Sequence, residues 1–270
     1  MKKILIPTDF SSVSDEAMNF AIEIGSKFKS DLLLYHVYSF NRRRDYNSDF
    51  SDDEQPFIKR INDKMNFTKR KFIDKVAEKG LSLQTKIEEA PIFSLFNSAV
   101  EENDISLIVM GSRGASGWKK VVFGSVAATA LDLATVPVLV VQPHHSMLSL
   151  EQIILATDLD KVSFKVLEPL QKLAFKFNSA VTLLNVNSGL SEEKHHDIDS
   201  YLKDLELSYR EVPMSQSIND TINAFLAQGN YDLLCMIRRE KGFFESLFQT
   251  SITKNQVYKS EIPVLILPES

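Results

Sequence analysis

Residues 111–134 read GSRGASGWKKVVFGSVAATALDLA and follow an apolar run that ends at Met110. Three of the nine glycines of the chain carry the pattern: Gly111, Gly114 and Gly124. Ser125 comes directly after the third glycine and opens a segment with helical periodicity. The order strand, glycine-rich loop, helix aims backbone N–H groups and the positive end of a helix dipole at one point, with no Cβ atoms in the way. The stretch therefore predicts a site for a phosphate group.

The composition is typical of a soluble globular protein. The chain has 270 residues, 44% of them apolar and 25% charged, and this length favours two domains of ordinary size. A net charge of −5 provides no general attraction to nucleic acid or to an anionic membrane. No window reaches the roughly 18 apolar residues of a membrane span, and Cys235 is the only cysteine, which fits a reducing compartment. We expect a cytoplasmic protein without nucleic-acid or membrane partners.

Apolar runs and helical patterns alternate through the first half of the chain. A polar loop is predicted for 41–55, and a helix begins at Ser125. The expected strands are Lys2–Thr8, Leu32–Tyr38, Leu81–Ile87, Ile105–Met110 and Pro137–Val141. The expected helices before the glycine loop are Val13–Phe28, Pro56–Lys79 and Ile92–Glu102. Strands joined by single crossover helices run parallel, so an α/β unit with five parallel strands is predicted.

The second half repeats the first. IILATDL at 153–159 matches ILIPTDF at 4–10 at an offset of 149, and DLLCM at 232–236 matches the run before Gly111 at an offset of 126. The two offsets differ by 23 residues, which are missing from the second half between its second and fourth strands. A repeat of this length predicts two homologous domains, residues 1–145 and 146–270.

The opening ILIPTDFS, the HV that closes the second strand, the spacing G-x2-G-x9-GS and the closing VPVLVV together resemble the universal stress protein family. The resemblance covers the whole chain, as a tandem of two such domains. It implies a Rossmann-like sheet of five parallel strands per domain, in the order 3-2-1-4-5, with helices on both faces. It also implies a stress-response role and an adenine nucleotide at the carboxyl ends of the strands, where the strand order reverses.

The resemblance assigns the nucleotide contacts position by position. Residues after the first two strands would meet the adenine and ribose, and those of the glycine loop and following helix would meet the ribose and phosphates. The cofactor-binding residues so implied are Pro7, Thr8, Asp9, Val37, Met110, Gly111, Arg113, Gly114, Gly124, Ser125 and Val126. The ligand is ATP, ADP or AMP, with or without Mg. The alternative is a structural loop whose glycines only allow a helix to pack closely on the sheet.

The second half departs from the motif at its glycines. Ile237, Glu240 and Thr250 replace the three glycines, and only the serine is kept, as Ser251. Branched and charged side chains would fill the phosphate space, and a carboxylate would repel phosphate. We therefore expect one nucleotide site per chain, in the first half.

No pattern indicates dedicated catalysis or a metal site, so no catalytic residue is assigned. A regulatory nucleotide-binding module is the first interpretation. A slow ATPase or autophosphorylating protein, with Ser125 or Thr8 as acceptor, and a nucleotide-free interaction scaffold are the alternatives. The closing strands of the two domains, 137–141 and 263–267, are expected to meet antiparallel in an intramolecular pseudo-dimer. A homodimer of chains is left open.

Overall fold

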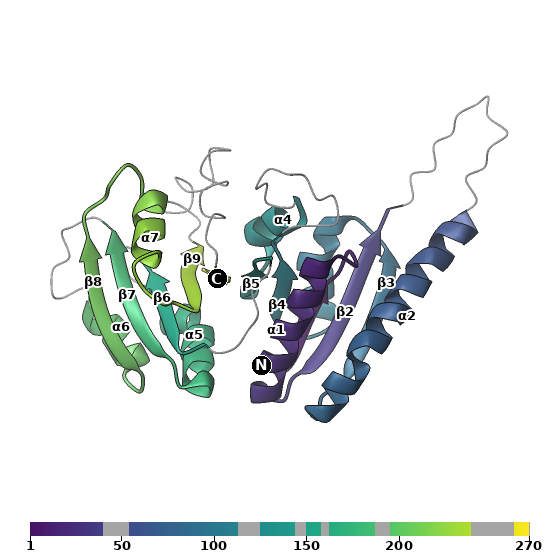
Figure 1. The fold of residues 1–270 in the computed structure, drawn as a ribbon, viewed down its shortest axis with the longest axis horizontal. Helices are drawn as coiled ribbons and strands as arrows, with labels where there is room; N and C mark the ends of the chain where they lie inside the picture. The colour runs from purple at the N-terminus through teal and green to yellow at the C-terminus, as the bar shows by residue number, and fades with distance from the viewer. Residues whose placement is uncertain are drawn as a thin grey trace.

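The computed structural model describes residues 1–39, 54–112, 125–143, 150–157, 162–186, 195–238 and 262–269. Within these ranges ten strands form one sheet, in the order β3-β2-β1-β4-β5-β10-β9-β6-β7-β8 (Figure 1). Their bounds are β1 Lys3–Pro7, β2 Asp31–Tyr38, β3 Leu83–Glu89, β4 Ile105–Gly111, β5 Val138–Val141, β6 Gln152–Ala156, β7 Ala180–Val186, β8 Glu206–Val212, β9 Leu233–Arg238 and β10 Val264–Pro268. The interior strands are almost wholly apolar and buried, as parallel strands covered on both faces are.

The two halves share this sheet. As the sequence analysis expects, the closing strands β5 and β10 pair antiparallel, with Leu139 opposite Leu265. This pairing joins the two predicted five-stranded units into one continuous sheet. All other neighbouring strands pair parallel. Without this pairing, two apolar strands would each present an open edge, so the continuous sheet removes a site of aggregation.

Helices cover both faces of the sheet. They are α1 Ser12–Phe28, α2 Glu54–Glu78, η1 Ile92–Phe96, α3 Ser98–Glu102, α4 Ser125–Leu133, α5 Phe164–Phe177, α6 His195–Leu202 and α7 Ile218–Leu226. Side chains of α1, α2, α5 and α6 belong to the apolar core on one face, and those of η1, α3, α4 and α7 to the core on the other. Each core contains residues of both halves, so the packing, like the sheet, runs across the repeat.

Helices α1 and α2 run side by side on one face. Three lysines of α2, four residues apart, meet three acceptors of α1 that are also four residues apart: Lys71 with Asp15 at 2.7 Å, Lys75 with Asn19 at 2.9 Å and Lys79 with Glu23 at 3.0 Å. The constant spacing means that the two helices are parallel and in register. Each exposed pair contributes little to stability, but together the pairs fix where α2 lies relative to α1.

Two predicted segments differ in the structure. The helix expected at Ile92–Glu102 is divided into η1 and α3, because the backbone at Asn97 (φ −118°, ψ −88°) leaves the helical region. The loop predicted at 41–55 lies mostly outside the described residues, and its last two positions, Glu54 and Gln55, already belong to α2. The second half has its 8-residue α6 where the first half has the 25-residue α2, which accounts for most of the missing residues.

Candidate functional site

The turn between β1 and α1 fixes the carboxylate of Asp9. This carboxylate accepts hydrogen bonds from the backbone N–H of Ser11 at 3.0 Å and from the hydroxyl of Ser14 at 2.5 Å. Ser11 is itself the N-cap of α1 and accepts from the backbone N–H of Ser14 at 3.3 Å. Phe10 adopts the left-handed region, with φ 65°, which non-glycine residues rarely do. The hydrogen bonds of this turn therefore hold the Asp9 carboxylate at the start of α1.

The ends of β1 and β2 are tied together by Thr8. Its N–H donates to the carbonyl of Tyr35 at 3.0 Å, and its carbonyl lies 2.7 Å from Nδ1 of His36. Because a carbonyl only accepts, Nδ1 is the donor. Burial lowers the pKa of His36, an effect that the Thr8 carbonyl opposes, so the ring is neutral at pH 7 and its Nε2 is an acceptor. The centre of the Phe10 ring lies 4.6 Å from that of His36, with the two ring planes tilted by 38°.

Gly111 brings the end of β4 against the first turn of α1. A Cβ at this position would lie 2.8 Å from Cγ1 and 3.2 Å from the backbone carbon of Val13. The absence of a side chain at Gly111 therefore allows α1 to pack closely against the end of β4. The next residue, Ser112, donates from its N–H to the carbonyl of Val141 at 2.8 Å. Its hydroxyl is buried, and no described residue gives it a hydrogen bond.

An apolar wall lies on the face covered by α3 and α4. Met110 in β4 belongs to the apolar cluster on this face, and Val37 near the end of β2 and Val126 in the first turn of α4 pack against that cluster. All three residues are among the predicted nucleotide contacts. Since β2, β1 and β4 are neighbours and run parallel, the wall lies at the same edge of the sheet as Asp9 and Gly111.

The structure thus gathers most of the predicted residues. Pro7, Thr8 and Asp9 follow or end β1, Val37 lies in β2, Met110 and Gly111 end β4, and Ser125 and Val126 begin α4. The chain reverses its direction of winding between β1 and β4, because α1 and α2 lie on one face and η1, α3 and α4 on the other. This is the position at which open α/β sheets bind ligands. Arg113, Gly114 and Gly124 lie outside the described residues, as does the side chain of Ser125.

A pocket that was not predicted from the sequence opens beside Asp9, on the face covered by α1 and α2. It measures about 380 Å³ and is lined by Asp9, Phe10, His36, Phe57, Arg60, Ile61 and Lys64. Four of these residues lie on α2 at helical spacing, a pattern that the sequence contains. No ion pair with a described acidic residue is found for Arg60 or Lys64. The pocket therefore combines cationic groups with aromatic rings.

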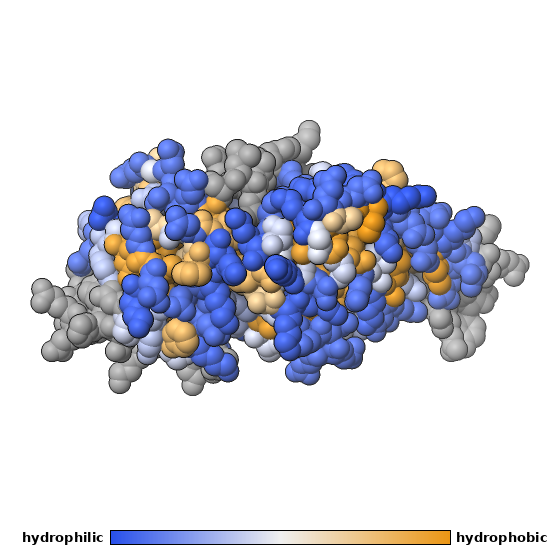
Figure 2. Space-filling view, turned by 90° about the horizontal axis from the view of Figure 1, so that it is seen from below, coloured by the Kyte–Doolittle hydropathy of each residue, from blue (hydrophilic) through white to orange (hydrophobic). Residues whose placement is uncertain are grey.

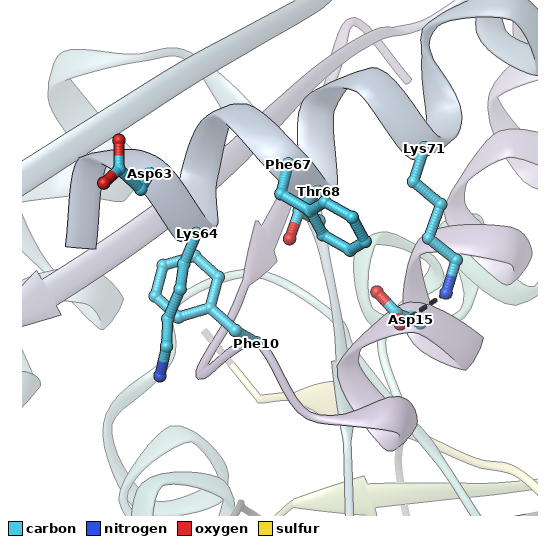
Figure 3. A pocket seen from close by; sticks show the side chains of 7 residues that line it. All are labelled: Phe10, Asp15, Asp63, Lys64, Phe67, Thr68 and Lys71. Carbon is cyan, nitrogen blue, oxygen red and sulfur yellow. Dashed lines mark hydrogen bonds and ion pairs between the residues drawn. The ribbon is translucent and has the colours of Figure 1, made fainter. Parts of the chain in front are cut away.

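A second pocket of about 340 Å³ adjoins the first along α2 (Figure 3). Phe10 and Lys64 line both, and Nζ of Lys64 lies 5.8 Å from the centre of the Phe10 ring. Figure 3 shows Phe67 projecting from α2 above the pocket, while Lys71 closes its far end through the ion pair with Asp15. The Phe67 side chain is 68% exposed. The surface of α2 that faces α1 is thus hollowed along several turns.

Other candidate chemistries are not visible in the described part of the chain. There, no three His, Cys, Asp or Glu side chains gather as a metal site would require. Cys235 is fully buried in β9, and burial strongly raises the pKa of its thiol, so it stays protonated.

The described helices include none with the length and apolar character needed to cross a membrane. Hydrophilic residues cover most of the face shown in Figure 2, with apolar residues in patches between them.

The sequence and the fold of this chain were compared with those of known proteins. The profile of the universal stress protein family matches residues 1–142. Universal stress protein YxiE of Bacillus subtilis is 30% identical over 149 residues, which are 52% of this chain and 98% of the relative. Universal stress protein MJ0531 of Methanocaldococcus jannaschii is 31% identical over 142 residues, 52% of this chain and 82% of the relative.

Two solved structures share the fold over nearly the whole chain. A universal stress protein from Archaeoglobus fulgidus superposes with a TM-score of 0.74 at 20% identity, covering 99% of this chain and 96% of the other. A putative universal stress protein from Pseudomonas aeruginosa gives a TM-score of 0.63 at 14% identity and covers 99% and 93%. With the profile match extending over more than half of its length, the chain belongs to the universal stress protein family.

Proposed function

We propose that this chain is a regulatory stress-response module that binds one adenine nucleotide, ATP, ADP or AMP, at the carboxyl ends of β1, β2 and β4. The observation that carries the proposal is that Asp9, Val37, Met110 and the start of α4 all lie at one edge of the sheet, where β1, β2 and β4 end. That edge offers a carboxylate for sugar hydroxyls or an exocyclic amine, an apolar surface for a base, and a helix N-terminus for phosphate.

The described residues fit a nucleotide in one further respect. The hydroxyl of Ser112 is buried next to Gly111 without a hydrogen bond from the described residues. Buried hydroxyls are normally satisfied, so this one supports a polar ligand or the adjoining loop as its partner. Arg113 and the helix start at Ser125 would supply positive charge and N–H groups for the phosphates. Any Mg would be held chiefly by the phosphates themselves.

We further propose that residues 1–145 and 146–270 are two copies of the family domain, paired as an intramolecular pseudo-dimer, and that only the first binds nucleotide. The packing around Ile237, the counterpart of Gly111, supports this. Ile237 and Val162, the counterpart of Val13, are both buried in one apolar cluster. Helix α5 begins at Phe164, which corresponds to Asp15, whereas α1 already begins at Ser12. The later start leaves room for the isoleucine side chain where the first half has a close turn.

Dedicated catalysis is not part of the proposal. Thr8, one candidate acceptor for autophosphorylation, is only 7% exposed, and its hydroxyl accepts a hydrogen bond from the N–H of Phe10 at 3.0 Å. A hydroxyl so placed is poorly suited to attack a phosphate. A slow ATPase would show itself as phosphate release above the rate in buffer, lost when the phosphate loop is altered.

Calorimetric titration of the purified chain with ATP, ADP and AMP tests the proposal, together with mass analysis of any nucleotide released on denaturation. We expect a stoichiometry of one per chain. Gly124→Val should abolish binding, because its side chain would occupy the space at the start of α4. Thr250→Val, at the matching position of the second half, should leave binding unchanged. A stoichiometry of two, no binding, or equal effects of the two substitutions would refute it.

A further inference from the structure

An arginine of the second half reaches into the first. Arg238 is the last residue of β9, and its guanidinium donates from Nη1 to the carbonyl of Leu131 and from Nη2 to the carbonyl of Ala134, both at 2.7 Å. Both acceptors belong to the C-terminal end of α4, more than a hundred residues earlier in the chain. Only the planar guanidinium of arginine can donate two hydrogen bonds in this fixed, forked geometry.

The end of α4 needs such a donor, because its own sequence does not close it. Helices commonly end in a glycine that turns the backbone and satisfies the last carbonyls, but Leu133 is followed by Ala134 and Thr135. Within the helix, Ala130 receives the N–H of Ala134 at 2.9 Å. With its amide nitrogen turned toward the helix, Asn97 donates to the carbonyl of Leu133 at 3.3 Å. Arg238 donates to the carbonyls of Leu131 and Ala134 and places a positive charge at the negative end of the helix dipole.

The other end of the same helix is the proposed phosphate site. Helix α4 has nine residues, about 14 Å at 1.5 Å per residue, and helices this short are marginal without tertiary contacts. A contact that fixes its C-terminal turn therefore also bears on its first turn, where Ser125 and Val126 lie. Val126 packs in the apolar cluster, so the helix is held at both ends.

Among the described residues the contact runs only from the second half to the first. At the offset of 126, Arg238 corresponds to Ser112, whose short side chain ends at a buried hydroxyl with no described partner. The described part of the first half therefore has no arginine at the matching position. The half that lacks the phosphate-binding glycines is the half that contributes the arginine.

We propose that Arg238 is a positioning residue for nucleotide binding: it caps α4 from the second half and thereby holds the N-terminus of this helix in the arrangement that binds phosphate. The proposal rests on the proposed function of the first half. It gives the second half a role that its own degenerate motif does not, as the support that completes its neighbour's site.

The size of the effect follows from the population of the competent helix. If losing the cap leaves α4 correctly formed and docked about one tenth of the time, the apparent Kd for nucleotide rises about tenfold. A lysine at this position keeps the charge but cannot make both bonds in a fixed fork, so its effect should be intermediate.

The test compares Arg238→Met and Arg238→Lys with Arg210→Met in the full chain. Arg210 is the matched control, because it is exposed and its guanidinium donates to the carbonyl of the adjacent Tyr209 at 2.8 Å. Three quantities are measured: the Kd for ATP by calorimetry, hydrogen exchange of residues 125–134 without nucleotide, and the thermal midpoint. We expect Arg238→Met to weaken ATP binding about tenfold and to speed exchange in α4, Arg238→Lys to do so less, and Arg210→Met to match the wild type.

The outcomes separate the two proposals. If the wild-type chain binds no nucleotide, the proposed function is wrong and the positioning role falls with it. If the wild type binds ATP and Arg238→Met binds it equally well, only the role of Arg238 is overturned. The positioning role is also overturned if Arg238→Met lowers the thermal midpoint but changes neither the ATP affinity nor the hydrogen exchange of α4. In that case Arg238 only stabilises the fold. Should Arg238→Met not fold, Arg238→Lys decides by the same criteria.

Discussion

Replacing Gly111 by alanine places a methyl group where the structure leaves no room. The new Cβ would lie 2.8 Å from Cγ1 of Val13 and 3.2 Å from its backbone carbon. The first contact could relax by rotation of the valine, but the second involves the backbone of α1 and cannot. Overpacking of this kind costs about 1–3 kcal/mol. We therefore expect Gly111→Ala to destabilise the chain by about 2 kcal/mol.

Urea denaturation followed by circular dichroism measures this loss. At a dependence of roughly 3 kcal/mol per molar urea, the midpoint should fall by about 0.7 M. The matched control is Gly25→Ala within α1, where the nearest atoms, at 3.2 Å, are the methyl ends of Leu32 and Leu81. Those atoms can move, and alanine favours the helix by about 1 kcal/mol, so this variant should equal or exceed the wild type. Equal midpoints for Gly111→Ala and the wild type would refute the packing argument.

Three further predictions concern polar groups. Because burial lowers the pKa of His36 below its ordinary value of about 6.5, the unfolded chain binds the extra proton first; stability should fall as the pH drops below that value. His36→Gln should flatten this dependence in urea midpoints taken between about pH 7.5 and 5.5, and an unchanged slope would contradict the assignment. Asp9→Ala leaves the N–H of Ser11 without its acceptor and leaves the hydroxyl of Ser14 only the more distant Ser11 hydroxyl, at 3.1 Å. A loss of about 1–3 kcal/mol in the same assay is expected, and no loss would mean that water replaces the carboxylate. Ser217 caps α7 by accepting from the N–H of Asp220 at 3.1 Å and donates to the carboxylate of the same residue at 2.8 Å. Ser217→Ala should therefore cost about 1 kcal/mol, against little change for Ser217→Thr, which keeps the hydroxyl, and equal losses for the two variants would contradict the capping role.

Strand and helix positions in the first half followed from local patterns. Continuous apolar runs marked β1, β2 and β4 to within one or two residues, because strands buried on both faces have little choice of composition. The start of α1 was visible in its capping serine. The break at Asn97 was not, since the apolar spacing of η1 and α3 reads as one helix and only the backbone angles at that residue separate them.

The candidate site was predictable only in part. Asp9, Val37 and Gly111 could be named because they follow or end predicted strands, and parallel strands bring those ends to one edge. The pockets along α2 could not be, because Phe10, His36 and Lys64 meet only once α2 has packed beside α1. Their sequence spacing carries no sign of that packing.

The sequence by itself determined the elements, the repeat and the place where a phosphate site is to be sought, since these depend on short-range periodicity and on glycines at fixed intervals. Only the tertiary structure decided the register in which β5 pairs with β10 and the contact by which Arg238 closes the end of α4. Both features join residues that are far apart in the chain. Such contacts depend on which strand edges and helix carbonyls are left without a hydrogen-bond partner within each half. The pairing of β5 with β10 brings Arg238 of the second half close to the end of α4 in the first.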